Sequence, residues 1–306
     1  MGLGNKISHV GNKYAAWGGS AWARPAEWVA LPTLTPGQER LVGLYRVNNA
    51  PNQCVAFTVA GNYTVDWGDG SAPENVASGV KAEHTYTFAN VPEETETEEG
   101  WRQAIISISP QAGATLTRIN LTSVHSVGTA NYTSWWLDVA AVGAGLTACL
   151  CGGTEGAALK PLSKMRRFQF IGTNSIANFA NMFRGCSSLQ FVPLFDTSSG
   201  TDFHYMFYGC SSLQSVPLFD TSSGTDFDYM FYGCSVLYAG ALSGTRYTIS
   251  YGNCKLDRAA IVAVFNALGT AVPPAQTITV TGNPGVPYLT PDDIAIATGK
   301  GWTVAT

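Results

Sequence analysis

The chain has 306 residues, of which 45% are hydrophobic and 12% are charged, and its formal net charge is −4. This apolar content suffices for several cores. The weakly acidic balance lacks the basic surface that binds nucleic acid, and no apolar run approaches the roughly 20 residues that span a bilayer, so neither nucleic acid nor membrane insertion is expected. Because soluble domains average about 25% charged residues, the low charge predicts extensive contacts with other subunits, as in a homo-oligomer.

The first segment, residues 1–46, is rich in Gly and Ala and contains Trp17, Trp22 and Trp28. It lacks the apolar core of a secretory signal, and it cannot form a core of its own. Exposed tryptophans are costly unless something covers them, so we expect this arm to dock either onto a partner or onto the rest of the chain. The three tryptophans are therefore candidate partner-binding residues of an anchoring arm.

Residues 47–112 alternate between apolar and polar side chains in a way that predicts β-strands. Alternation over residues 55–59 and again over residues 63–67 predicts two strands around a Gly61-Asn62 turn. After an acidic loop, residues 101–108 alternate once more, and we expect them to close the sheet.

The motif Trp67-Gly68-Asp69-Gly70 precedes a second motif, His84-Thr85-Tyr86. Together they resemble the turn and the following strand of polycystic-kidney-disease (PKD) β-sandwich domains. The resemblance implies a spacer or adhesion module in which Trp67 anchors the core, Asp69 bonds backbone amides of the turn, and Gly70 supplies a positive φ. Asp66 and Asp69, three residues apart on a turn, could instead offer oxygen ligands to calcium.

Three short motifs share the pattern Met-Phe-x-Gly-Cys and recur every 24 residues, at residues 182–186, 206–210 and 230–234. A fixed period of this length predicts a solenoid of stacked coils, none of which buries its apolar face alone. Each coil is expected to contribute one short parallel strand. The side chains expected to point inward from these strands are Leu189, Val192 and Leu194, and their equivalents Leu213, Val216 and Leu218.

Weaker copies of this apolar pattern extend the solenoid in both directions. They are Leu116/Ile119/Leu121, Leu146/Cys149/Cys151, Met165/Phe168/Phe170, Leu237/Gly240/Leu242 and Ala275/Ile278/Val280. Asn283 follows the last copy, where such repeats place an asparagine that bonds the turning backbone, and a helix is expected over residues 256–268. We therefore divide the chain into an arm (1–46), a β-sandwich (47–112), a solenoid (113–255, clearest at 182–234) and a closing repeat (256–306).

Cys186, Cys210 and Cys234 occupy equivalent positions of successive coils. Stacked coils hold identical side chains parallel, roughly 4.8 Å apart, whereas a metal needs convergent thiolates, so we expect small buried side chains and no metal site. The chain has seven cysteines, an odd number without paired spacing, which argues against a disulfide scaffold. Free thiols indicate assembly in a reducing cytoplasm.

The step Gly209-Cys210-x-x-Leu213-x-x-Val216-Pro217 resembles the BspA-like leucine-rich-repeat family. Its Met-Phe-x-Gly-Cys and Phe-Asp-Thr-Ser variant is similar to a subgroup common in mycoplasma, gut-bacterial and phage proteins. Together the resemblances imply a fold that is mainly β with some α. It would comprise an extended arm, a PKD/Ig-like β-sandwich, a leucine-rich-repeat solenoid of parallel strands, and a C-terminal α/β cap.

Catalytic patterns are missing from the sequence. The four histidines lie in different predicted modules without partners at ligand spacing, and the chain contains neither a nucleophile elbow nor a phosphate-binding loop. We therefore expect a non-enzymatic protein without catalytic residues, cofactor or metal. The alternative is a hydrolytic site assembled between subunits, which would leave no local motif.

A repeat adhesin without an export signal, joined to a PKD-like spacer and a Trp-rich arm, resembles a bacteriophage virion protein. The resemblance implies a tail fibre or receptor-binding adhesin on the virion surface, assembled in the host cytoplasm. Its arm would bind other virion proteins, and its solenoid would meet a host-surface glycan or protein. A capsid decoration or other structural virion protein is one alternative, and a bacterial adhesion module is another.

Two surface stripes are candidate partner sites. The first comprises strand positions outside the core, namely Gln190, Phe191, Pro193 and Phe195, repeated as Gln214, Ser215, Pro217 and Phe219. The second comprises Tyr205, Tyr208, Tyr229 and Tyr232, which suit a sugar or protein partner but could equally stack between coils. The two complete copies of the coil differ only in Phe191 against Ser215 and His204 against Asp228, so we expect partner contacts at these positions.

Overall fold

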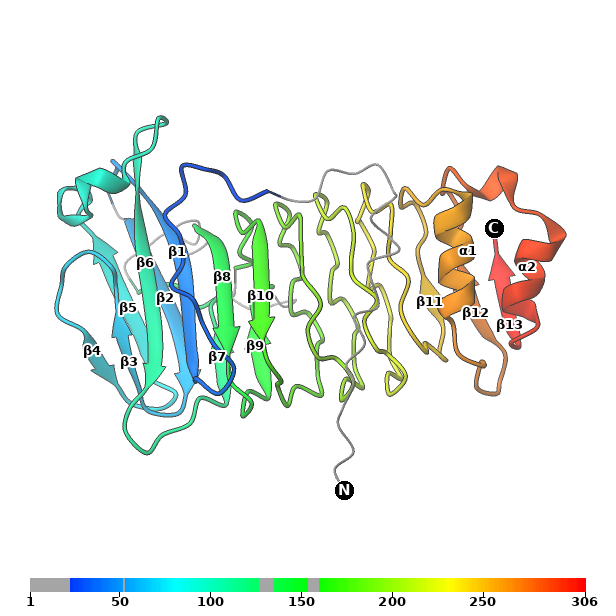
Figure 1. Ribbon diagram of the computed structural model, residues 1–306, viewed down its shortest axis with the longest axis horizontal. Coiled ribbons are helices and arrows are strands. Elements are labelled where there is room, and N and C mark those ends of the chain that lie inside the picture. The colour runs from blue at the N-terminus through cyan, green and yellow to red at the C-terminus, as the bar shows by residue number, and fades with distance from the viewer. Residues whose placement is uncertain (1–22, 52, 127–134, 154–159) are drawn as a thin grey trace, which may run out of the picture.

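A computed structural model describes residues 23–51, 53–126, 135–153 and 160–306. In this part of the chain the fold is mainly β, with three sheets and two α-helices, which confirms the predicted class. The molecule is elongated, with the larger sheets at one end, the helices at the other, and coils of irregular backbone between them (Figure 1). None of the described helices has the length and apolar character needed to cross a membrane.

Two sheets form the N-terminal end of the molecule. The first has the order β10-β8-β1-β6-β3-β4, and the second has the order β5-β2-β7-β9. Their strands are β1 (Arg40–Asn48), β2 (Gln53–Ala60), β3 (Tyr63–Asp66), β4 (Glu74–Val76), β5 (Lys81–Tyr86), β6 (Trp101–Pro110), β7 (Arg118–Asn120), β8 (Trp136–Val142), β9 (Ala148–Leu150) and β10 (Arg167–Ile171). Short 3-10 turns follow β5 at Phe88–Asn90 and Glu93–Thr95.

Aromatic side chains from the two sheets pack against one another. Tyr45 of β1 stacks on Tyr86 of β5 with ring centroids 5.5 Å apart, and Phe57 of β2 lies 5.4 Å from Trp67. The Tyr45 hydroxyl donates to the Cys54 carbonyl at 2.8 Å, so its buried oxygen is paired. This core continues without a break through the coils to Trp302 of the C-terminal strand.

The Gly61-Asn62 turn joins strands of different sheets, because β2 belongs to the four-stranded sheet and β3 to the six-stranded one. The two predicted strands are therefore present, but they belong to different sheets and do not form a hairpin. Gly61 has φ +105°, and a Cβ there would lie 2.1 Å from the Thr115 carbonyl oxygen. Only glycine allows the chain to cross between the sheets at this point.

Residues 40–46, which the sequence analysis assigned to the arm, are part of the core. They belong to β1, which pairs antiparallel with β6 on one side and with β8 on the other. Both faces of β1 are buried, so its apolar run shows no alternation to separate it from the preceding segment.

Trp28, the described tryptophan of the predicted arm, packs onto the chain itself. It is 6% exposed in a cluster with Leu44, Trp101 and Leu137, so of the two predicted alternatives it follows docking onto the rest of the chain and is buried from a partner. Nearby, Arg24 donates to the fully buried carboxylate of Asp138 at 2.9 Å. Trp17 and Trp22 lie outside the described residues.

Beyond β10 the backbone stacks in coils with the period of the repeat. The amide of Phe179 donates to the Asp202 carbonyl at 2.8 Å, and the amide of Phe203 donates to the Asp226 carbonyl at 2.8 Å. The ring of Phe203 stacks between those of Phe179 and Phe227, at 5.3 Å from each. Each coil therefore covers the apolar face of its neighbour.

The coils differ from prediction in their inward positions. Over residues 172–248, all described, the backbone pairs through isolated bridges and forms no strand. Leu194 and Leu218, predicted to point inward, are 64% and 45% exposed. Phe195 and Phe219, predicted for the surface stripe, are 5% and 0% exposed. A proline follows each inward valine and interrupts strand alternation, so the next buried side chain comes three residues later instead of two.

The C-terminal end is a three-stranded parallel sheet with the order β11-β12-β13 and two helices. Its elements are β11 (Ile249–Ser250), α1 (Arg258–Ala267), β12 (Gln276–Thr279), a 3-10 turn (Val286–Tyr288), α2 (Pro291–Thr298) and β13 (Trp302–Ala305). The predicted helix is α1. Asn283 bonds the turning backbone as expected, donating to the Tyr251 carbonyl at 2.7 Å and accepting from the Leu256 amide at 2.9 Å. Ala275, predicted to be inward, is exposed.

Candidate functional site

Four tyrosines from two successive coils form the most exposed aromatic surface among the described repeats. Tyr205 stacks on Tyr229 and Tyr208 stacks on Tyr232, with ring centroids 5.1 Å apart in both pairs. Tyr229 is 53% exposed and Tyr232 is 58% exposed. We call these four residues the tyrosine ladder. The rings stack between coils, as one of the two readings predicted, and those of Tyr229 and Tyr232 also face solvent.

The backbone beneath the ladder is unusual. Tyr205 has φ 55° and Tyr229 has φ 54°, which places both in the left-handed region. The equivalent residue of the preceding coil, Asn181, has φ 59°. Asparagine tolerates this conformation, whereas a bulky residue there is a rare and strained choice that costs on the order of 1–3 kcal/mol. The two central coils thus carry tyrosine where the fold accommodates asparagine at less cost.

Arg184 covers one end of the ladder. It occupies the coil position of Tyr208 and Tyr232, 24 residues before the first of them. Its guanidinium carbon lies 4.8 Å from the ring centroid of Tyr205 and 5.1 Å from that of Tyr208. At this distance the positive charge is attracted to the electron-rich ring faces.

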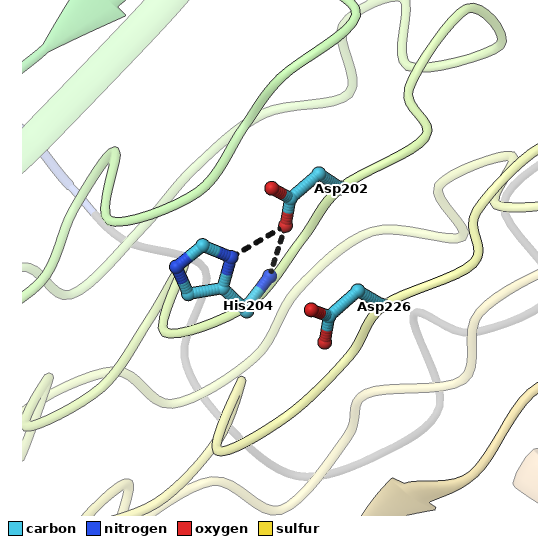
Figure 2. Close-up of side chains that lie close together, drawn as sticks. All are labelled: Asp202, His204 and Asp226. Carbon is cyan, nitrogen blue, oxygen red and sulfur yellow. Dashed lines mark hydrogen bonds and ion pairs between the residues drawn. The ribbon is translucent and has the colours of Figure 1, made fainter.

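Figure 2 shows a cluster of two carboxylates and one imidazole, which lies next to the ladder residue Tyr205. Ligand atoms of Asp202, His204 and Asp226 all lie within 4.8 Å of one another. His204 Nδ1 lies 2.6 Å from Asp202 Oδ1, which also accepts from the His204 amide at 3.1 Å. The His204 ring lies 5.5 Å from Tyr205, which links the cluster to the ladder. One imidazole and two carboxylates are chemically able to hold a divalent metal.

The repeat itself accounts for the carboxylates of this cluster. Asp226 Oδ1 accepts from the amide two residues on at 2.9 Å. In the preceding coils Asn178 makes the same bond, to the Ala180 amide at 2.8 Å, and its amide nitrogen donates to Asp202 Oδ2 at 3.1 Å. A side-chain oxygen that accepts from the residue two positions on holds a turn, and asparagine does this as well as aspartate. The position therefore requires an acceptor, whether or not it carries charge.

Asp226→Asn is expected to leave the free energy of unfolding unchanged or to raise it by up to about 0.5 kcal/mol. The amide keeps the turn bond and removes a like charge beside Asp202. Asp226→Ala removes the acceptor and is expected to cost about 1 kcal/mol. Urea denaturation of both variants measures the difference, and an equal loss in both would contradict the turn-holding role.

Residues 162–243 match the family described as "Mycoplasma protein of unknown function, DUF285". The match includes the tyrosine ladder, Arg184 and the acid and imidazole cluster. Comparisons with curated proteins and with solved structures found no match. The chain is thus similar to this family over its central coils, and the family description assigns no activity.

The remaining predicted stripe is less accessible than the ladder. Phe191 and Ser215 are half-buried and form parallel bridges to Arg167 and Ala239. Asp228, the counterpart of His204, is exposed beside Tyr229. Sequence periodicity found the ladder residues, but it gave no sign of their left-handed backbone. The available signal was Asn181, which lies in the same 24-residue register.

The three stacked cysteines lie in the core. Each thiol donates to a backbone carbonyl, with Cys210 Sγ 3.1 Å from the Phe183 oxygen and Cys234 Sγ 3.1 Å from the Phe207 oxygen. Burial raises the pKa of the Cys210 thiol well above its usual range, which disfavours the reactive thiolate. All seven cysteines lie in the described residues, and all are free and buried.

The motif Trp67-Gly68-Asp69-Gly70 and His84 build a polar node around the buried carboxylate of Asp69. Asp69 Oδ1 accepts from the Ser71 amide at 3.1 Å, and Oδ2 lies 2.7 Å from His84 Nε2. Burial alone would raise the pKa of the Asp69 carboxyl, but hydrogen bonds from Ser71 and His84 outweigh burial and lower it. Trp67 is 2% exposed and stacks on His84 at 4.8 Å, and Gly70 has φ 83°. Both carboxylate oxygens are thus engaged in holding the turn.

Proposed function

We propose that this chain is a non-enzymatic binding protein that presents the tyrosine ladder to a partner. The carrying observation is that Tyr205 and Tyr229 stack their rings on a left-handed backbone that the preceding coil occupies with asparagine, and that the Tyr229 ring is exposed. Large rigid rings lose little entropy on contact, which suits them to binding by shape. A strained residue that holds an exposed side chain in place is typical of a functional surface.

We further propose that the protein is a tail fibre or receptor-binding adhesin on a bacteriophage virion. In this proposal the coils are a BspA-like leucine-rich-repeat solenoid and the two N-terminal sheets a PKD-like β-sandwich. The stacking at the 24-residue period, the Asn283 turn and the Trp67–Asp69–His84 node support that assignment. The segment preceding β1 attaches the protein to other virion proteins, and the ladder meets a host-surface glycan or protein.

A capsid decoration or other structural virion protein is the second candidate. The charged fraction of 12% favours it, because a protein packed among identical neighbours needs fewer charged residues at its contacts. Mass spectrometry and immunogold labelling of purified particles separate the candidates. A few copies at the tail tip support the adhesin, many copies on the head support the decoration, and absence from particles contradicts both.

The double variant Tyr205→Asn/Tyr229→Asn tests the binding surface. Relief of the left-handed strain stabilises the folded chain by about 1 kcal/mol, and loss of ring stacking destabilises it by about 1 kcal/mol. Because the two effects oppose each other, the free energy of unfolding is expected to change by less than about 1 kcal/mol. Adsorption of the labelled protein to host cells is expected to be lost. Leu218→Asn, which also replaces an exposed apolar side chain, is the matched control and is expected to adsorb normally. Normal adsorption of the double variant would contradict the proposed surface.

A further inference from the structure

We propose that the ring pair of Tyr229 and Tyr232 binds the guanidinium group of an arginine side chain on the partner, which is therefore a protein. This inference rests on the proposed function and names the chemistry that the tyrosine ladder recognises. Three independent observations carry it, namely an internal example of the same contact, the exposure of the second ring pair, and the distribution of charge around it.

The internal example is Arg184. Its guanidinium lies over both rings of the pair Tyr205 and Tyr208, 4.8 Å and 5.1 Å from their centroids. The second pair repeats the first one coil later, with its two rings 6.1 Å apart against 5.2 Å in the first pair. A planar cation that stacks on one pair therefore finds a similar pair of ring faces on the other.

The repeat supplies no second arginine to the second pair. The next coil is shorter, because Cys254 follows Cys234 by 20 residues and Tyr251 stacks on Phe231 at 4.9 Å. The residue that follows Tyr232 in the stack is therefore Gly252, which has no side chain. The described cation contacts of the ladder are those of Arg184, and Tyr229 and Tyr232 remain 53% and 58% exposed. The ring faces at this end are accordingly accessible to a group from outside the chain.

Charge near the second pair favours a cation. Asp228 is exposed and directly precedes Tyr229, and Asp226 lies two residues before Asp228. In the otherwise near-identical preceding coil the counterpart of Asp228 is His204. One of the two differences between the copies thus adds a carboxylate beside the accessible rings. A carboxylate pairs with a guanidinium through charge-assisted hydrogen bonds, and it repels an anionic glycan.

Titration of the full chain with N-acetyl-arginine amide, followed by the ring signals of isotope-labelled tyrosines, tests the proposal. The signals of Tyr229 and Tyr232 are expected to shift. The lysine analogue is expected to bind about threefold more weakly, and the citrulline analogue, which has the same shape without charge, is expected to cause no shift. Equal binding of lysine would overturn the guanidinium assignment, and equal binding of citrulline would overturn recognition of a cation.

Two variants locate the site. Tyr232→Leu is expected to weaken arginine amide binding about fivefold, and Asp228→His, which restores the residue of the preceding coil, about threefold. Leu218→Asn is expected to bind like the parent chain. Unchanged binding in both site variants would place the arginine elsewhere and contradict the proposal.

Failure of this inference differs from failure of the proposed function. If arginine amide does not bind while Tyr205→Asn/Tyr229→Asn still abolishes adsorption to cells, the ladder binds a partner of other chemistry. Shifts of the same ring signals on titration with host-surface polysaccharide would then identify a glycan and refute the arginine. If the double variant adsorbs normally, the ladder is not the binding surface and the proposed function itself fails.

Discussion

A chain that lacks residues 1–46 is expected not to fold. The deletion removes all but the last two residues of β1, which lies between β6 and β8 in the six-stranded sheet. Loss of an interior strand exposes two hydrogen-bonding edges and removes the buried side chains of Leu41, Leu44 and Tyr45. Circular dichroism and size-exclusion chromatography should show loss of a cooperative melting transition together with aggregation.

A chain that lacks only residues 1–22 is the matched control, because every described contact of β1 and of Trp28 remains in it. We expect it to melt cooperatively. It also tests attachment to the particle separately from folding, since a folded chain that no longer joins virions would support an anchoring role for the deleted segment. Cooperative melting of the chain that lacks residues 1–46 would contradict the requirement for β1 in folding.

Phe203→Ala is expected to lower the free energy of unfolding by about 3–5 kcal/mol. The Phe203 ring is fully buried and stacks between Phe179 and Phe227, so its removal leaves a cavity in the middle of the coil array. Neighbouring coils are tied to this one by backbone bonds on both sides, which limits collapse around the cavity. Urea denaturation followed by circular dichroism measures the loss.

Leu218→Ala is the control for that experiment. Leu218 lies in the following coil and is 45% exposed, and substitutions at such positions are usually within about 0.5 kcal/mol of the parent. A large loss for Leu218→Ala with a small one for Phe203→Ala would show that the strand alternation expected from the sequence is correct. That result would contradict the inward positions described for the coils.

The stacking of the coils was predictable because a repeated sequence must offer the same apolar positions to both neighbours. The 24-residue spacing, the closing helix and the Asn283 turn follow from local sequence patterns in the same way. The inward positions after Val192 and Val216 were not predictable from alternation. Each valine is followed by a proline, which cannot donate a ladder bond, and the chain there turns instead of extending.

Two other features, the strand β1 and the backbone conformation of the ladder, were also missed by the sequence analysis. Residues 41–45 of β1 are buried on both faces of the sheet, so no alternation of polar and apolar side chains separates this strand from the Trp-rich segment before it. The site depended on a backbone angle. Tyr205 and Tyr229 read as aromatic positions of a stripe, and the sequence signal of their left-handed φ is the asparagine in the same register, Asn181.

The backbone hydrogen bonds between coils allow the tyrosine ladder to become longer or shorter by whole coils. Each coil donates to the next one through equivalent residues, so a unit of 24 residues can be gained or lost by recombination between near-identical copies without disturbing either end. One added unit would move the C-terminal sheet outward by roughly 4.8 Å and lengthen the row of rings by one pair. A single in-frame duplication can thus change both the length of the molecule and the number of ring pairs on its surface, while the fold stays the same.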